Sequence, residues 1–303
     1  MLKADITTDV ARCLIDTQFP HWSSLSIRAV ALDGWDNTTF RLGDDMSIRM
    51  PSADWYVPQV EKEHRWLPAL APDLPVPVPT PLEKGVPGCS FPRPWSVYGW
   101  LTGQLATRDH IDAPEVFAQD LAEFLSALYS IPPTDGPPAG AHSFNRGGPV
   151  QVWEEQALWF ISEMSGVIDT AWAKEVWATA MASVWTHEPV WVHGDVSPSN
   201  LLVIGGRLSG VLDFGCSAVG DPACDLTIAW TLFDGPSRAT FKSLLPFDAE
   251  TWDRGRGWAL WKASATYVRA MRARRDPERA GDQFGWSRSP REMIEDLLVD
   301  RNG

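Results

Sequence analysis

The segment that runs from Trp191 to Gly215 constrains the fold of this chain more than any other part of the sequence. A polar loop, HGDVSPSN, lies between the apolar runs WV and LLVI. A Gly-Gly turn and a further run that ends in LDFG follow. Short apolar runs joined by such a turn are typical of a β-hairpin. Because a hairpin brings its two ends together, we expect Asp195, Asn200 and Asp213 to face one cavity.

These three side chains form a set of hard oxygen ligands. Carboxylate and amide oxygens suit Mg²⁺, and Mg²⁺ also holds nucleotide phosphates. A carboxylate that is free of the metal can accept a proton from a hydroxyl group. The pattern is therefore compatible with a phosphoryl-transfer site. The alternative is that the three residues only cap the turns of a hairpin.

The first hundred residues alternate short β-like runs with turns, as a meander of antiparallel strands does. One helical stretch, QVEKEHRWLPAL, interrupts them, and we expect it to stop near Pro68 and Pro72. The proline-dense residues 72–85 are expected to form an extended connector, because proline fixes φ and lacks an N–H donor. A β-type run, WSVYGWLTG, then ends at a glycine.

Helical periodicity dominates from Asp112 onward, and Asp112 is the expected N-cap of the first of these helices. Ser289 and Glu292 have the spacing of a capping box at the start of the last helix. The whole pattern predicts an α+β chain of two lobes. A β-rich N-terminal lobe covers residues 1–101 and ends in a hinge, and a mainly helical C-terminal lobe covers residues 102–303. Five tryptophans are assigned to the core of the C-terminal lobe: Trp153, Trp159, Trp177, Trp258 and Trp261.

Composition excludes several classes of protein. The formal net charge of −13 disfavours a nucleic-acid partner, and it is compatible with a cationic substrate or with plain solubility. No apolar run is long enough to cross a bilayer, and the first residues do not resemble a signal peptide. The four cysteines show no C-x-x-C pair and no zinc-like spacing, so we expect reduced thiols and a cytoplasmic protein.

The motifs resemble those of a known family. HGDVSPSN followed by LDFG resembles the catalytic loop and the metal-binding motif of the protein-kinase-like fold, and it is closest to the aminoglycoside phosphotransferase family. GDPACDL, beyond the metal motif, is similar to that family as well. In the N-terminal half, SIRMP resembles the strand with the basic phosphate-binding residue, EKEHRWL resembles the following helix, and SVYGWLTG resembles the last strand and the hinge.

The resemblance implies a role for each matching residue. Asp195 is implied as the catalytic base, or as the carboxylate that orients the acceptor hydroxyl. Asn200 and Asp213 are implied as ligands of Mg²⁺ that bridges the phosphates of ATP or GTP. The backbone groups of Gly99 and Leu101 are expected to pair with the purine base. His193 and Asp225 are expected to hold the loops in place.

The N-terminal matches depart from the pattern of the protein kinases. Arg49 stands where a lysine is expected, with Glu63 as its implied ion-pair partner, and arginine can clamp phosphate oxygens in a bidentate manner. Each of these two residues is alternatively a solvated surface charge. Ser197 occupies a place often taken by a basic residue and is expected to bond the γ-phosphate. The phosphate-covering segment DGWDNTTF has no G-x-G-x-x-G.

The sequence therefore predicts an ATP- or GTP-dependent, Mg²⁺-dependent O-phosphotransferase that acts on a hydroxyl group of a small molecule. An antibiotic such as an aminoglycoside, or a macrolide, is the acceptor that the family resemblance suggests. A kinase of a small metabolite (an amino alcohol, a choline-like compound or a sugar) is the alternative. A non-catalytic nucleotide-binding regulator of the same fold is another, although the intact motif argues against it. The H-G-D form weighs against a protein kinase.

Overall fold

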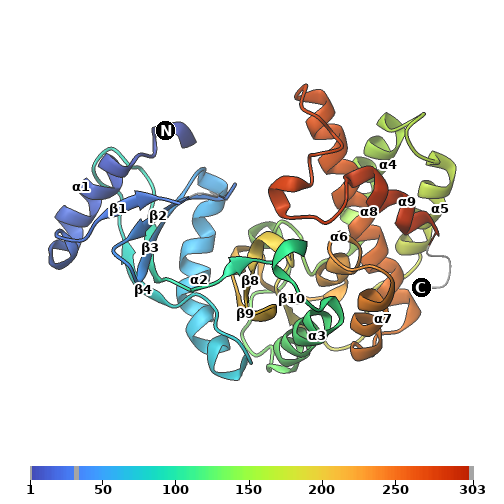
Figure 1. Cartoon of the computed structure of the whole chain (residues 1–303), viewed down its shortest axis with the longest axis horizontal. Coiled ribbons are helices and arrows are strands. Elements are labelled where there is room, and N and C mark those ends of the chain that lie inside the picture. The colour runs from blue at the N-terminus through green and yellow to red at the C-terminus, as the bar shows by residue number, and fades with distance from the viewer. Residues whose placement is uncertain (1, 31–33, 300–303) are drawn as a thin grey trace. The chain divides into compact units, whose positions relative to one another are not determined.

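The computed structural model describes residues 2–30 and 34–299. The chain divides into two compact units, and each is described by itself (Figure 1). The first unit comprises the residues up to Pro72 together with Pro77–Thr102 and Asp213–Gly215. The second comprises Asp73–Val76, Gly103–Leu212 and the residues from Cys216 on. Among the described residues, no helix has both the length and the apolar character to cross a membrane.

The first unit is built on an antiparallel sheet of five strands in the order β1-β2-β3-β5-β4. Its strands are β1 (Ile27–Ala29), β2 (Asn37–Leu42), β3 (Met46–Pro51), β4 (Pro81–Gly85) and β5 (Trp95–Gly99). Arg49 lies on the central strand β3, where it is opposite Thr39 of β2 and Ser96 of β5. The expected meander is present. The proline-dense connector is wrong in part, because its end forms β4 at the edge of the sheet, where a strand tolerates proline.

Two helices complete the first unit: α1 (Thr8–Gln18) and α2 (Val57–Leu70). The inner face of α1 buries Leu14 and Ile15 in one core cluster with Ile48 and Trp95 of the sheet. The α2 helix ends at Leu70, between Pro68 and Pro72, so the expected end near these two prolines is confirmed, although the helix continues through Pro68. The proline falls in the last turn, where its missing N–H removes a single intrahelical hydrogen bond.

A disulfide bond links Cys13 on α1 to Cys89 in the loop between β4 and β5. The expectation of four reduced thiols is therefore wrong for this pair. It failed because the two cysteines are 76 residues apart in sequence, and spacing alone does not show that the fold brings them together. Cys216 and Cys224 are not in a disulfide.

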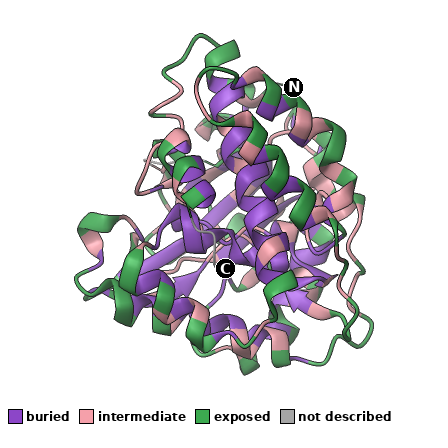
Figure 2. Cartoon of the chain, turned by 90° about the vertical axis from the view of Figure 1, so that its right-hand side faces the viewer, coloured by how far each residue is buried: buried purple, intermediate pink, exposed green. Residues whose placement is uncertain are grey.

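The second unit is mainly helical. Its longest helix, α8 (Ala249–Arg272), is buried along most of its length and packs against α4, α5 and α9. Figure 2 shows helices that are buried along one side and exposed along the other, as amphipathic helices are. The other helices are α3 (Pro114–Ser130), α4 (Glu154–Glu163), α5 (Thr170–Met181), α6 (Ile228–Thr231), α7 (Gly235–Leu244) and α9 (Pro290–Val299).

Local signals placed these helices with mixed success. The capping box is confirmed, since the Ser289 amide donates to Glu292 Oε2 at 2.9 Å and the Glu292 amide donates to Ser289 Oγ at 3.2 Å. Asp112 is not an N-cap: α3 begins at Pro114, which needs no partner for a backbone N–H in the first turn. Four of the five tryptophans assigned to the core are buried or partly buried, but Trp159 is 40% exposed.

The predicted hairpin is confirmed as β8 (Leu201–Ile204) and β9 (Arg207–Val211), which pair in antiparallel fashion around Gly205 and Gly206. Both glycines have positive φ values, 58° and 75°, as the tight hairpin turn requires. A short strand, β6 (Gln104–Leu105), pairs with β8. A second antiparallel pair consists of β7 (Val190–Val192) and β10 (Ala218–Gly220). The polar loop leaves β7 and enters β8.

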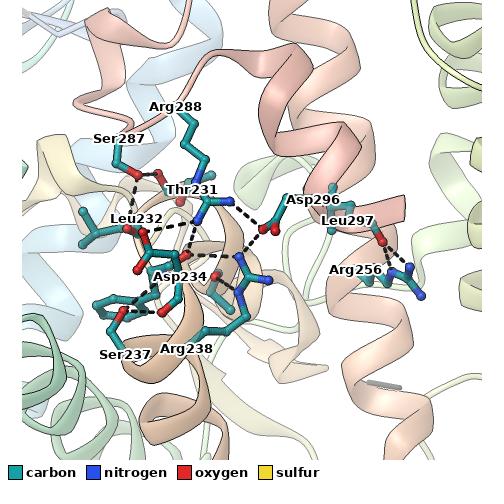
Figure 3. Close-up of polar contacts among 12 residues, drawn as sticks. Thr231, Leu232, Asp234, Ser237, Arg238, Arg256, Ser287, Arg288, Asp296 and Leu297 are labelled. Carbon is teal, nitrogen blue, oxygen red and sulfur yellow. Dashed lines mark hydrogen bonds and ion pairs between the residues drawn. The ribbon is translucent and has the colours of Figure 1, made fainter. Parts of the chain in front are cut away.

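Charged side chains fix the C-terminal helix α9 to the rest of the second unit (Figure 3). Asp296 on α9 forms an ion pair with Arg288 at 2.6 Å and another with Arg238 of α7. The backbone oxygen of Leu297 accepts from Arg256 of α8, with Nε at 2.8 Å. These contacts anchor the segment that precedes α9, whose Phe284 meets the polar loop.

Candidate active site

The first group of site residues lies in the first unit around Arg49. Its Nη1 atom is 3.2 Å from both carboxylate oxygens of Glu63 on α2, and its Nη2 atom is 2.9 Å from Asp213 Oδ1. The hydroxyl group of Tyr98 also donates to Glu63. The side chains of Arg49 and Glu63 are 14% and 4% exposed, so the alternative of two solvated surface charges is wrong.

Charge compensation explains how this buried guanidinium is tolerated. Burial disfavours its charged form, but the carboxylates of Glu63 and Asp213 outweigh burial and raise the pKa of Arg49. Asp213 has a φ of 62°, a left-handed conformation that aspartate adopts more readily than most residues. At Gly215, a Cβ atom would lie 2.6 Å from Cδ of Gln59, so a larger residue of the LDFG motif would have to displace the end of that side chain.

The end of β5 and the residues that follow it, up to Leu101, form the predicted hinge, whose backbone groups could bind a ligand. The Gly99 N–H donates to the Thr80 carbonyl at 2.9 Å and is therefore already used. The backbone of Leu101 makes no hydrogen bond to any of the described residues, so its N–H and C=O groups are available. Of the phosphate-covering segment predicted from sequence, Asp33 lies outside the described residues.

The second group lies in the second unit, in the polar loop between β7 and β8. The side-chain amide of Asn200 donates to Asp195 twice, to the backbone oxygen at 2.9 Å and to Oδ2 at 3.2 Å. The other carboxylate oxygen, Oδ1, accepts from Lys262 Nζ at 2.8 Å. Lys262 is on α8, 67 residues further along the chain. The structure thus brings Asp195 and Asn200 together and adds a lysine that no motif marks.

The carboxylate of Asp195 is kept ionised by its neighbours. Burial alone would raise its pKa, but the ammonium of Lys262, with smaller contributions from Arg146 and His193, lowers the pKa of Asp195 to about 2. The side chain is 36% exposed, so the charged oxygen remains accessible to a ligand. An ionised, accessible carboxylate can orient a hydroxyl group and accept its proton.

Buried Asp225 fixes the approach to Asp195. Its two carboxylate oxygens accept from the backbone N–H groups of His193, at 2.9 Å, and Gly194, at 2.7 Å. The imidazole of His193 in turn lies 2.8 Å from the Leu212 carbonyl. His193 and Asp225 therefore hold the loops, as expected.

Only glycine fits between His193 and Asp195. Gly194 has a φ of 83°, a value that favours glycine. A Cβ atom at this position would lie 2.4 Å from the Cys216 carbonyl oxygen and 3.0 Å from Arg146 Cβ. The local packing thus accounts for the H-G-D form of the motif.

Ser197 is 1% exposed, and its hydroxyl lies 3.4 Å from the Phe284 carbonyl oxygen, to which it donates. This contact ties the polar loop to the segment before α9. The structure does not bring Ser197 into hydrogen-bonding contact with Asp195, and its expected bond to a γ-phosphate stays a prediction.

The donor atoms of the expected metal ligands suit Mg²⁺. With its amide nitrogen bonded to Asp195, Asn200 has its amide oxygen left over, and Asp213 has one carboxylate oxygen that Arg49 does not bind. Amide and carboxylate oxygens are what this ion prefers. The described residues contain no cluster of three or more His, Cys, Asp or Glu side chains arranged to hold a metal ion. That Asp213 shares a cavity with Asp195 and Asn200 stays a prediction.

Comparison with known proteins assigns the family. The model of the phosphotransferase enzyme family, APH, matches residues 26–258, which is most of the chain. The chain belongs to the phosphotransferase enzyme family. The predicted family and the predicted α+β, protein-kinase-like fold are confirmed, and the prediction of a phosphotransferase enzyme is confirmed at the level of the family.

Similar proteins extend over the chain at low identity. The uncharacterized protein YcbJ of Bacillus subtilis (strain 168) is 25% identical over 197 residues, which cover 64% of this chain and 58% of that protein. The GDP and kanamycin complex of APH(2")-IIIa has a TM-score of 0.67 and 20% identity, and the match covers 95% of this chain and 96% of the other. Macrolide 2'-phosphotransferase MphH from Brachybacterium faecium has a TM-score of 0.59 and 21% identity, with 90% and 96% of the chains covered. These structures show a shared fold.

Proposed function

We propose that this chain is a small-molecule kinase that transfers the γ-phosphoryl group of ATP or GTP to a hydroxyl group of its acceptor. The observation that carries the proposal is the ionised carboxylate of Asp195, which Asn200 and Lys262 hold in the loop of a phosphotransferase-family chain. In the proposed reaction the acceptor oxygen forms a bond to phosphorus, and the bond from phosphorus to the β–γ bridging oxygen breaks. The hydroxyl proton passes to Asp195, and the nucleoside diphosphate leaves.

The remaining site residues are proposed to position the donor. Asn200 and Asp213 are proposed as Mg²⁺ ligands, and the ion would neutralise phosphate charge when bound. Arg49, which Glu63 orients, is proposed to bind phosphate oxygens. Leu101 is proposed to pair with the purine through its backbone, together with the Gly99 carbonyl. The structures of similar fold include complexes with GDP, ADP and ATP, which supports a nucleotide donor and leaves the choice between adenine and guanine open.

The acceptor is supported less directly. The relatives of similar fold include aminoglycoside and macrolide phosphotransferases, and the prediction of an antibiotic acceptor rests on that likeness. A small metabolite with a free hydroxyl group fits the same chemistry. Acceptor specificity depends on helices and loops around Asp195 rather than on the shared motifs.

The test is nucleotide turnover by the purified full-length chain with Mg²⁺ and either ATP or GTP, across a panel of hydroxyl acceptors. We expect acceptor-dependent release of ADP or GDP. Asp195→Ala should lower kcat by about 10²-fold or more while nucleotide binding is retained, because the lost carboxylate acts on the acceptor hydroxyl. Tight nucleotide binding without turnover on any acceptor would contradict this proposal and favour the regulatory alternative.

A further inference from the structure

Two cationic side chains, Lys262 and Arg146, lie beside Asp195 in the second unit, and a third, Arg269, interacts with Arg146. Lys262 contacts the carboxylate of Asp195 at 2.8 Å. The stem of Arg146 packs on Gly194, the residue directly before Asp195, since a Cβ atom at Gly194 would be 3.0 Å from Arg146 Cβ. The third is Arg269, two turns beyond Lys262 on α8. Positive charge therefore lies beside the base, from Lys262 on α8 and Arg146 in the loop before α4, and it continues along α8 to Arg269.

Arg146 interacts electrostatically with Asp195 without a direct ion pair. Among the described residues, neither Arg146 nor Arg269 forms a salt bridge, whereas Arg272, one turn further on α8, binds Glu163 at 2.6 Å. The pKa of Arg269 is lowered, first by burial and then by the charge of Arg146, so the two guanidinium groups repel each other. Arg146 uses one N–H group on the Phe144 carbonyl at 3.3 Å. Its other N–H groups lack an acceptor in the described chain.

Aromatic rings contact the guanidinium groups of both arginines. The guanidinium carbon of Arg146 lies 4.8 Å from the ring centre of Trp261 and 5.2 Å from that of Trp258. Arg269 lies 5.5 Å from the ring of Phe160 on α4. The indole N–H groups of Trp258 and of Trp153, which stacks on Trp261, have no acceptor among the described residues. Apart from Asp195, the polar groups of this cluster are mainly donors.

We propose that Arg146 and Arg269 form an anion-binding subsite of the acceptor site, and that the acceptor carries a carboxylate or phosphate group beside the hydroxyl that is phosphorylated. Two guanidinium groups that form no salt bridge among the described residues, together with the buried indole N–H groups, match the oxygens of such a group. A polycationic acceptor would add like charge to the cluster and would be repelled. The inference rests on the proposed function, since it takes Asp195 as the group that faces the acceptor hydroxyl. It replaces the aminoglycoside suggested by family likeness with an anionic acceptor.

The test measures binding to the full-length protein saturated with Mg²⁺ and the non-hydrolysable analogue AMP-PNP, so that the donor phosphates are already in place. The anionic probes are gluconate and 3-phosphoglycerate, glucose and glycerol are their neutral counterparts, and kanamycin is the polycation. Tryptophan fluorescence reports the binding, because Trp258 and Trp261 contact Arg146. We expect each anion to bind at least about tenfold more tightly than its neutral counterpart.

Variants separate the subsite from general surface charge. Arg146→Gln and Arg269→Gln should each weaken anion binding about tenfold. Arg272→Gln is the matched control on the same helix, and it should bind the anions as the wild type does because its charge is already paired with Glu163. Since Arg269 is exposed, its variant tests the subsite even if Arg146→Gln does not fold.

The outcomes distinguish this inference from the proposed function. Equal affinity for anionic and neutral probes in a protein that turns over ATP or GTP would overturn the anionic acceptor and leave the kinase proposal intact. The same holds if the arginine variants weaken AMP-PNP binding and leave probe binding unchanged, because the cations would then serve the donor. Anion binding that depends on both arginines, without nucleotide turnover, would support the subsite and overturn the kinase proposal.

Discussion

At the scale of single residues, the ionisation of Asp195 depends mainly on one neighbour, Lys262, which no sequence motif identifies. Lys262 offsets the burial of the carboxylate and lowers its pKa to about 2. A base with a depressed pKa stays ionised as the pH falls, until the pH approaches that value. We therefore expect kcat/KM of the wild type to show no acid limb from Asp195 between about pH 5 and pH 8.

Removal of the lysine charge should expose this dependence. Lys262→Met leaves burial without its main compensation, so the pKa of Asp195 should rise and an acid limb should move upward by about one pH unit or more. Lys262→Arg keeps the positive charge and is the control. The pH profile of kcat/KM provides the measurement, and an unchanged limb in Lys262→Met would show that another group sets the ionisation.

The same residues show where sequence reasoning succeeds at this scale. Asp195 and Asn200 could be found because one short loop holds both at a fixed spacing, and Arg49 and Glu63 because each matches a motif. Lys262 was not found, since it reaches Asp195 from a helix 67 residues away. An isolated lysine in a helical pattern carries no signal of its tertiary partner.

At the scale of elements, features that depend on neighbouring residues could be predicted from the sequence, and contacts between distant segments could not. The Gly-Gly hairpin and the Ser289 capping box depend on neighbouring residues, and both could be predicted. Asp112 failed as a cap because Pro114 sets the start of α3. The disulfide of Cys13 joins two distant segments, so no local pattern pointed to it.

A buried ion pair joins α8 to the turn after β10, and its contribution to stability can be measured. Arg254 Nε lies 2.7 Å from Asp221 Oδ2, and the two side chains are 2% and 4% exposed. Arg254→Met would leave a buried carboxylate unpaired, so we expect a loss of about 3–5 kcal/mol in the free energy of unfolding. Burial already raises the pKa of Asp221 despite Arg254, so the loss should be smaller at low pH, where the carboxyl group is protonated.

Arg272→Met is the control for this experiment, because the Arg272–Glu163 pair is more exposed and should contribute only about 0–1 kcal/mol. Urea denaturation at pH 7 and pH 5 measures both variants. Equal effects of the two substitutions would contradict a structural role for the buried pair.

At the scale of the whole molecule, each of the two units is stabilised by contacts of its own. The first unit has its own core cluster around α1 and the sheet, and its disulfide joins α1 to the loop before β5. The second unit is organised around α8, and its Cys216 and Cys224 are not in a disulfide. A reductant should therefore destabilise the first unit alone. A cross-link that closes a loop of 76 residues stabilises a fold by about 2–4 kcal/mol.

Calorimetry with and without reductant measures this difference. We expect one thermal transition to fall by roughly 10 °C or more on reduction while the other keeps its midpoint, since two independently cored units need not unfold as one. A Cys13→Ser, Cys89→Ser double variant should melt as the reduced protein does and should not respond to the reductant. Thiol titration of the denatured protein should detect only Cys216 and Cys224 before reduction. Detection of all four thiols at that stage, or a joint shift of both transitions, would contradict a disulfide that stabilises one unit.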